Sequence, residues 1–179
     1  MRVTALTTEV IVASEPLVRV GSEEIRLLKR AAEKNERRRM RLCAHPHVDS
    51  PIQEMIIALA RGIYIRPHKH PKKSESLHVI EGKADVVFFD DSGTIRDVLS
   101  LTAMPSQQGV HYYRLESPWF HTLWIRSRVF VFHETINGPF RHKHTQFAPW
   151  SPDENAARLH AKYLKTLSQQ INSFRRKPS

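Results

Sequence analysis

Short runs of β-favouring apolar residues recur between turn signals from residue 52 to residue 134. Runs of this length that alternate apolar and polar positions are typical of strands that bury one face. The segment Asp90-Asp91-Ser92-Gly93 is a strong hairpin signal within the region. The expected strands cover residues 55–59, 62–66, 77–80, 84–89, 94–96, 111–115, 121–125 and 129–132. Because no helical period separates them, the pattern predicts an all-β sandwich or small barrel.

Helical patterns lie on both sides of this region. Residues 22–24 look like a capped helix start, and Ile25, Leu28 and Ala32 follow at steps of three and four. We therefore expect a helix from residue 22 to about 38. Near the end of the chain, Ser151-Pro152-Asp153-Glu154 forms a capping box with proline at the first helical position. An apolar stripe continues from Ala157 to Phe174, which predicts a second, C-terminal helix.

The length of 179 residues suits a single folded domain. We expect an N-terminal arm at 1–21 and a domain at 22–150, with the barrel at about 52–134. The C-terminal helix and a basic tail occupy 151–179.

Composition narrows the class of protein. Lysine and arginine number 28 and aspartate and glutamate 18, which gives a formal charge of +10. The single cysteine, Cys43, excludes a disulfide framework and a cysteine-based zinc finger. No apolar run approaches the roughly 18 residues of a membrane span, and the first twenty residues lack the apolar core of a signal peptide. We therefore expect a cytoplasmic protein with no membrane partner.

The basic residues gather in two runs, at 29–41 and 175–177. Such runs can bind the phosphates of a nucleic acid. No aromatic residues interleave for base stacking, and the first run continues a helical pattern, so a solvated helix face is favoured. The positive charge would still attract small anionic molecules.

The candidate chemistry lies in the strand region. His68 and His70 are two apart, so in a strand their imidazoles share one face and can grip one ion. Glu75 follows after a turn that can bring its carboxylate back to that ion. His121 begins a later strand, whose inward face it shares with Leu123. Three histidines and one glutamate would hold a divalent ion with open positions: iron, manganese, nickel, cobalt or zinc.

Four further residues are candidates for the same site. If one strand continues from Tyr64 to His70, Tyr64 and Arg66 share the face of His68. Both would then bind substrate, with Arg66 binding an anionic group. The alternatives are a structural ion pair for Arg66 and core packing for Tyr64. His111 and Glu116 precede His121 and would move a proton, or else occupy solvated strand positions.

The spacing from Gly62 through His68, His70 and Glu75 to Gly82 resembles the first metal-binding motif of the cupin superfamily. The second cupin motif corresponds to residues 115–121, which end in His121. Here Glu116 and Pro118 stand where proline and glycine are common.

A closer resemblance is to the WbuC-type cupin fold metalloproteins, over about residues 23–155. It is carried by residues 50–53, 64–71 and 147–152. The resemblance implies a cupin double-stranded β-helix (jelly roll) with a bound divalent metal, often encoded among genes for polysaccharide or O-antigen biosynthesis. Cupins usually pair through sheet edges, so a homodimer is expected. The resemblance implies no settled reaction.

Three functions remain open. The first is a metal-dependent enzyme acting on a small anionic oxygenated substrate, such as a sugar derivative. It would be an isomerase or epimerase, or an oxygenase (dioxygenase) if the metal is redox-active. The second is a non-catalytic, metal-dependent sugar-binding or accessory protein of polysaccharide assembly. The third, least favoured, is a nucleic-acid phosphate binder using residues 29–41.

Overall fold

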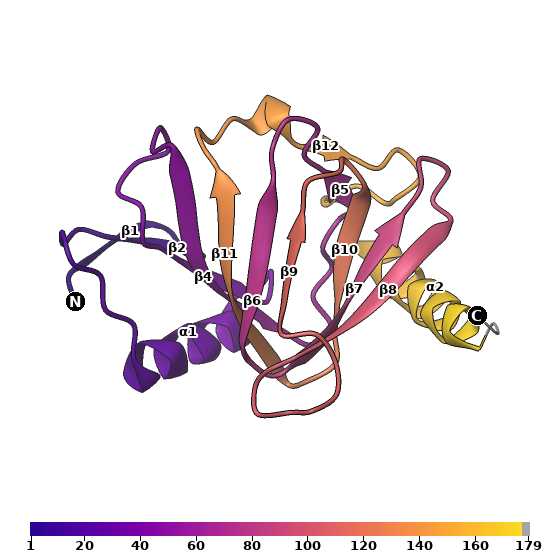
Figure 1. The fold of residues 1–179 in the computed structure, drawn as a ribbon, viewed down its shortest axis with the longest axis horizontal. Helices are drawn as coiled ribbons and strands as arrows, with labels where there is room; N and C mark the ends of the chain where they lie inside the picture. Colours follow the sequence, from indigo (N-terminus) through magenta and orange to yellow (C-terminus); the bar gives the residue numbers. More distant parts are fainter. Residues whose placement is uncertain (177–179) are drawn as a thin grey trace.

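The computed structural model describes residues 1–176, without the side chain of His142. Its strands form two facing sheets (Figure 1). The seven-stranded sheet has the order β1 (Val3–Thr7), β2 (Val10–Ala13), β3 (Arg39–Cys43), β4 (Ile52–Ala60), β11 (Val129–Asn137), β6 (Glu75–Glu81) and β9 (Tyr112–Leu115). The five-stranded sheet has the order β12 (Gln146–Phe147), β5 (His68–Lys69), β10 (Phe120–Ile125), β7 (Lys83–Phe89) and β8 (Ile95–Thr102). A short 3₁₀ helix, η1, covers His142–His144.

Side-chain alternation divides the apolar residues between the two faces of each sheet. On β11, Phe130 and Phe132 join the core between the sheets, whereas Val129 and Val131 pack on the outer face. The inner core draws on both sheets and includes Leu77, Val86 and Ile125. The jelly-roll sandwich predicted from the sequence is confirmed.

The helix α1 (Ser22–Lys34) covers the outer face of the seven-stranded sheet through Leu28 and Ala32. It ends four residues before the predicted limit of about 38. Asn35 has extended backbone angles, and its side-chain amide donates to the carbonyl oxygen of Arg39 at 2.8 Å. The chain therefore turns into β3, and the end of the basic run at 29–41 lies on a strand.

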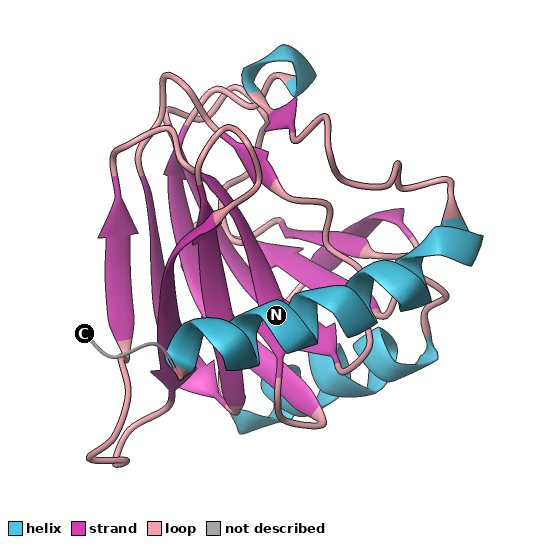
Figure 2. Ribbon diagram, turned by 90° about the vertical axis from the view of Figure 1, so that its right-hand side faces the viewer, coloured by secondary structure: helices cyan, strands magenta, loops and turns pink. Residues whose placement is uncertain are grey.

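The helix α2 (Ala157–Arg175) packs through Leu167 and Ile171 on the outer face of the five-stranded sheet (Figure 2). It also carries a cation to a buried carboxylate, because Arg175 Nη2 lies 2.6 Å from Asp85 Oδ1. The predicted start at 151–154 is wrong. Ser151 Oγ donates to the carbonyl oxygen of Ala148, and Asp153 binds Arg66, so these residues make tertiary contacts instead of capping a helix.

Two other boundaries also differ from the prediction. Residues 63–67 form no strand, since Gly62 turns the chain away from β4 and Pro67 cannot donate a ladder hydrogen bond. The sheets extend beyond 52–134, because β1, β2 and β3 add strands at one edge and β12 adds one after residue 134. Lys177, at the end of the basic tail, lies outside the described residues. No helix in the described range is long and apolar enough to cross a membrane.

The two glycines of the motif differ in what surrounds them. Both have positive φ, +86° at Gly62 and +92° at Gly82. At Gly82 the chain passes from one sheet to the other, and an added Cβ would lie 2.5 Å from the carbonyl oxygen of Val129. At Gly62 the nearest atom would be Arg38 Nε at 3.9 Å.

We predict that Gly62→Ala lowers the free energy of unfolding by about 1–2 kcal/mol through left-handed strain alone. Gly82→Ala should cost about 1–3 kcal/mol more, because backbone must also move. Urea unfolding of the two variants checks the order. Equal losses would contradict the close packing at Gly82.

Candidate metal centre

Three histidines and one glutamate gather where one end of the two sheets meets. His68 lies on β5, directly opposite His121 of β10 in the antiparallel register, and His70 follows β5. Glu75 is the first residue of β6 and reaches the group from the other sheet. The structure thus brings together all four residues that the sequence proposes as metal ligands.

The distances within this group are short. The imidazole centroid of His68 lies 4.7 Å from that of His121 and 5.2 Å from that of His70. His121 Nε2 lies 3.0 Å from Glu75 Oε1, and His70 Nε2 lies 3.8 Å from Glu75 Oε2. Each carboxylate oxygen therefore faces a different imidazole.

Backbone carbonyl groups orient the imidazoles from behind. His68 Nδ1 lies 2.8 Å from the carbonyl oxygen of Arg66, and His121 Nδ1 lies 3.1 Å from that of Trp119. His70 Nδ1 lies at 3.4 Å from the carbonyl oxygen of His144. In a neutral imidazole that donates its Nδ1–H in this way, Nε2 carries the lone pair, which is how proteins orient metal-binding histidines. His121 differs here, because its Nε2–H donates a hydrogen bond to Glu75.

Burial and mutual charge set the protonation of the group. Burial, followed by the charges of His121 and His70, lowers the pKa of His68 from its usual 6.5 to about 3. Burial alone would raise the pKa of Glu75, but the three histidines, His121 most of all, together outweigh it and lower that pKa to about 2. For His121, burial opposes protonation, yet the Glu75 carboxylate raises the pKa overall. At neutral pH the cluster thus holds an ionised carboxylate and a neutral His68.

The donor set fits a divalent cation. Two neighbouring ligands about 2.1 Å from an octahedral ion lie about 3 Å apart, which is the separation of His121 and Glu75. As the side chains lie, however, no three His, Cys, Asp or Glu residues within 1–176 form a complete metal-binding group. Glu75 instead hydrogen bonds directly to His121. The donors are gathered, and metal binding itself is a proposal.

Arg66 and Tyr64 do not join this cluster. Arg66 Nη1 lies 2.6 Å from Asp153 Oδ2, and its guanidinium group lies over the ring of Phe147. The Tyr64 hydroxyl donates to the carbonyl oxygen of Pro152 at 2.7 Å, and its ring stacks on His160. Because no strand forms at 63–67, the expected shared face with His68 does not exist. The contacts of both residues tie this segment to the chain around α2.

The two residues expected to transfer protons also lie elsewhere. Leu115 faces the core opposite Glu75, so Glu116 points outward, where it is exposed and pairs with Arg114. His111 lies four residues before Leu115, or about 13 Å along the chain. Its Nδ1 atom lies 2.7 Å from the carbonyl oxygen of Thr102.

The sequence analysis missed Glu134, which lies on the inner face of β11 in line with Phe132. Burial and then the negative charge of Glu75 raise the pKa of Glu134 to about 7, while Arg41 and His121 act against this. Burial also raises the pKa of Tyr113, on the inner face of β9. Glu134 follows Phe130 and Phe132 at steps of two, so it shares their inward face. An acidic residue at such a position is the sequence signal that could have revealed it.

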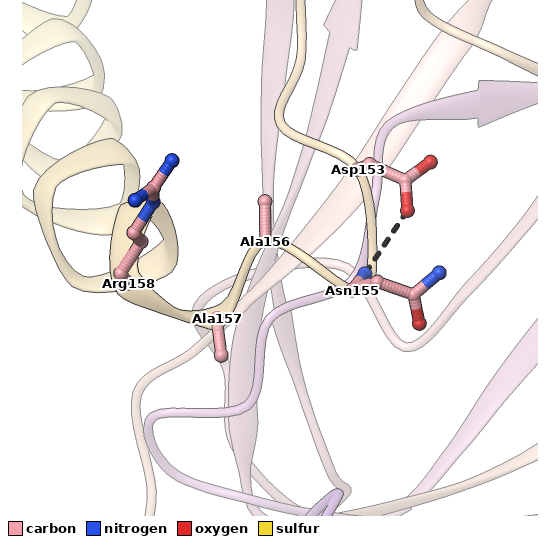
Figure 3. A pocket seen from close by; sticks show the side chains of 5 residues that line it. All are labelled: Asp153, Asn155, Ala156, Ala157 and Arg158. Carbon is pink, nitrogen blue, oxygen red and sulfur yellow. Dashed lines mark hydrogen bonds between the residues drawn. The ribbon is translucent and has the colours of Figure 1, made fainter.

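A surface hollow lies apart from the histidines, at the start of α2 (Figure 3). Its lining residues are Asp153, Asn155, Ala156, Ala157 and Arg158. Asp153 accepts a hydrogen bond from the backbone N–H of Asn155 (Figure 3). The hollow includes none of the four clustered residues.

Comparisons with known proteins indicate the fold of this chain but assign it no activity. A family model described as a domain of unknown function (DUF6016) matches residues 20–101. No curated protein matches the chain in sequence.

Several solved structures are similar in fold. An oxalate decarboxylase from Bacillus subtilis is 18% identical over 56% of this chain and 24% of that chain, with a TM-score of 0.44. An oxalate oxidase in complex with the substrate analogue glycolate is 12% identical over 79% of this chain and 74% of that one, with a TM-score of 0.49. A protein with a double-stranded β-helix domain from Klebsiella pneumoniae is 16% identical over 62% of this chain and 79% of that one, with a TM-score of 0.46. This chain spans about a quarter of the decarboxylase's length.

Two facing sheets, antiparallel except for the β2–β3 pair, are linked by crossings such as the turn at Gly82 and make this chain a cupin-type double-stranded β-helix. The fold class predicted from the sequence is therefore confirmed. Similarity at the level of these solved structures says nothing about a substrate.

The shifted pKa values of His68, Glu75 and Glu134 make the stability of the metal-free protein depend on pH. Below pH 6.5 the unfolded chain protonates His68 while the folded chain does not until about pH 3. Glu75 acts in the same direction between about 4.5 and 2. The raised pKa of His121 adds no slope below 6.5, because both states then hold its proton. As the pH falls, His68 and Glu75 should each lower the free energy of unfolding by up to about 1.4 kcal/mol per pH unit within its own range. Glu134 acts in the opposite direction between about pH 7 and 4.5, because the folded chain takes up its proton there and the unfolded chain does not.

Urea unfolding of the metal-free protein from pH 7 to pH 4 measures this slope. His68→Asn should remove the destabilisation that His68 causes below pH 6.5, so that this variant loses less stability on acidification than the wild type. His78→Asn, at an exposed position on β6, should behave like the wild type. The same pH dependence in the wild type and in His68→Asn would contradict the burial of a neutral His68.

Proposed function

We propose that this cupin-fold protein binds one divalent metal ion through His68, His70, Glu75 and His121. The observation that supports the proposal most is the arrangement around Glu75. Its carboxylate faces the Nε2 atoms of two imidazoles, and backbone carbonyls hold the Nδ1 atom of all three histidines. The four residues would form a ligand set whose supporting hydrogen bonds are already in place.

The proposed substrate is a small anionic oxygenated molecule, such as a sugar derivative. A bound divalent ion would polarise an oxygen atom of that molecule or of water. His68 is already neutral at neutral pH and could bind the ion as it stands. His121, whose pKa is raised by Glu75, would release its Nε2 proton on binding the ion. The excess of cations in the chain supports attraction of an anion. Isomerisation, epimerisation and oxygenation are all compatible with this donor set.

The second proposal is a metal-dependent sugar-binding or accessory protein without catalysis. The positions of Glu116 and His111 favour it over the original catalytic assignment, because neither proton carrier contacts the cluster. A role in polysaccharide or O-antigen biosynthesis, WbuC-type membership, a cytoplasmic location and a homodimer remain predictions from the sequence.

We predict that the purified protein carries about one divalent ion per chain. His70→Ala should lose most of it, because a ligand is missing from an otherwise intact site, and His78→Ala should keep it. Elemental analysis measures the metal, and circular dichroism confirms that the variants fold. A wild-type protein that takes up none of Fe²⁺, Mn²⁺, Ni²⁺, Co²⁺ and Zn²⁺ would rule the proposal out.

The same variants separate the two functions. Turnover of a nucleotide sugar or sugar acid that disappears in His70→Ala would favour the enzyme. Metal-dependent binding of such a molecule, without turnover, would favour the accessory protein.

A further inference from the structure

The inner face of the seven-stranded sheet carries polar side chains that the proposed metal ligands leave unused. Paired positions on neighbouring strands place Cys43, Met55, Glu134, Leu77 and Tyr113 in one row across the sheet. Cys43, Met55 and Leu77 belong to the core between the sheets, so the row faces inward. Glu134 and Tyr113 are its two ionisable oxygen-bearing members.

Glu134 lies next to the metal cluster. It pairs with Leu77 of β6, while Glu75 pairs with Ile136, so the two glutamates are diagonal neighbours on adjacent strands. Diagonal neighbours on one face of a sheet are within reach of long side chains. A molecule bound at the cluster would therefore lie beside Glu134.

A cation shares this inner face. Arg41 precedes Cys43 by two residues on β3, and side chains two apart in a strand point to the same side. The charges of Arg41 and Glu134 both act on the pKa of the Cys43 thiol, with opposite sign. Arg41 also lowers the pKa of Glu134. In the register, Arg41 pairs with Ile57 and Ile57 pairs with Phe132. Arg41 and Glu134 therefore lie on the same face, two strands apart and offset by two residues.

Neither group has a protein partner for its charge. Among the described residues, the side chains of Arg41 and Glu134 make no hydrogen bond and no ion pair within 4 Å. Arg39, two residues earlier on the same strand, pairs with Glu9, and Arg66 pairs with Asp153. Both residues are half-buried, so their charged groups are left for a bound polar molecule or for water to pair with.

We propose that Arg41 and Glu134 form an anion subsite, in which Arg41 binds the carboxylate of a small hydroxy acid and Glu134 accepts a hydrogen bond from its hydroxyl group. Tyr113 closes the far side of this row, with its ring edge-to-face on Phe88 at 5.9 Å between centroids. That the acid also reaches the histidine cluster rests on the proposed function. In this proposal Arg41 binds the anion. Arg66, to which the sequence assigned that role, already pairs with Asp153.

The chemistry of the pair selects this class of ligand. A guanidinium group matches a carboxylate with two parallel hydrogen bonds. A carboxylate beside it would repel a second anionic group but accept a hydroxyl donor. A hydroxy acid offers both features on neighbouring carbon atoms, whereas a simple alcohol or an unsubstituted acid offers one.

Calorimetric titration of the full chain with D-glycerate, glycerol and propionate tests the subsite. Wild-type protein should bind glycerate more tightly than propionate and should not bind glycerol. Arg41→Gln should weaken glycerate binding by about tenfold or more, because a charge-assisted pair is lost. Glu134→Gln should chiefly reduce the preference for glycerate over propionate. Arg30→Gln, which removes the same charge from an exposed position on α1, should leave binding unchanged.

Two results would contradict the proposed subsite. No glycerate binding by the wild type, or equal weakening in Arg41→Gln and Arg30→Gln, would remove the subsite. If Arg41→Gln fails to fold by circular dichroism, Arg41→Lys takes its place and should weaken binding by a smaller factor. Metal content is measured on the same samples. Loss of glycerate binding in Arg41→Gln with full metal content assigns the loss to Arg41. Arg41-dependent binding by protein that takes up none of the added divalent ions keeps the subsite and refutes the metal proposal.

Discussion

The site depends on one contact between the two sheets, in which the carboxylate of Glu75 faces the Nε2 atoms of His121 and His70. A buried carboxylate on its own would take up a proton or destabilise the fold. Here the imidazoles keep it ionised, and the apolar core below it holds the sheets at a fixed separation. The hydrophobic core and the polar cluster therefore constrain each other.

Much of this arrangement could be predicted from the sequence, because strands with one buried face alternate in a recognisable way. Glu75, Leu77 and Val79 face inward while His78 faces out, as period two requires. The spacing from His68 to Glu75 likewise predicted the gathering of donors on facing strands. These features are local, and local patterns are what a single sequence records.

Other features depend on partners that are distant in the chain. The role of Arg66 follows from Asp153, and the capping-box residues at 151–154 are occupied by contacts with Arg66 and Tyr64. The prediction that one strand runs from Gly62 through Pro67 placed the side chains of Tyr64 and Arg66 on the face of His68, and that placement is wrong. Glu134 was overlooked because the inner faces of β11 and β6 become neighbours only when the sheet is assembled.

The central claim is that a cation occupies the space between Glu75 and the three histidines. A crystal structure with anomalous scattering recorded at the absorption edge of the bound metal locates that cation directly. The account predicts a single peak within ligand distance of Glu75 and of His68, His70 and His121. A peak elsewhere in the chain, or electron density in which Glu75 bonds only to His121 in protein saturated with metal, would contradict it.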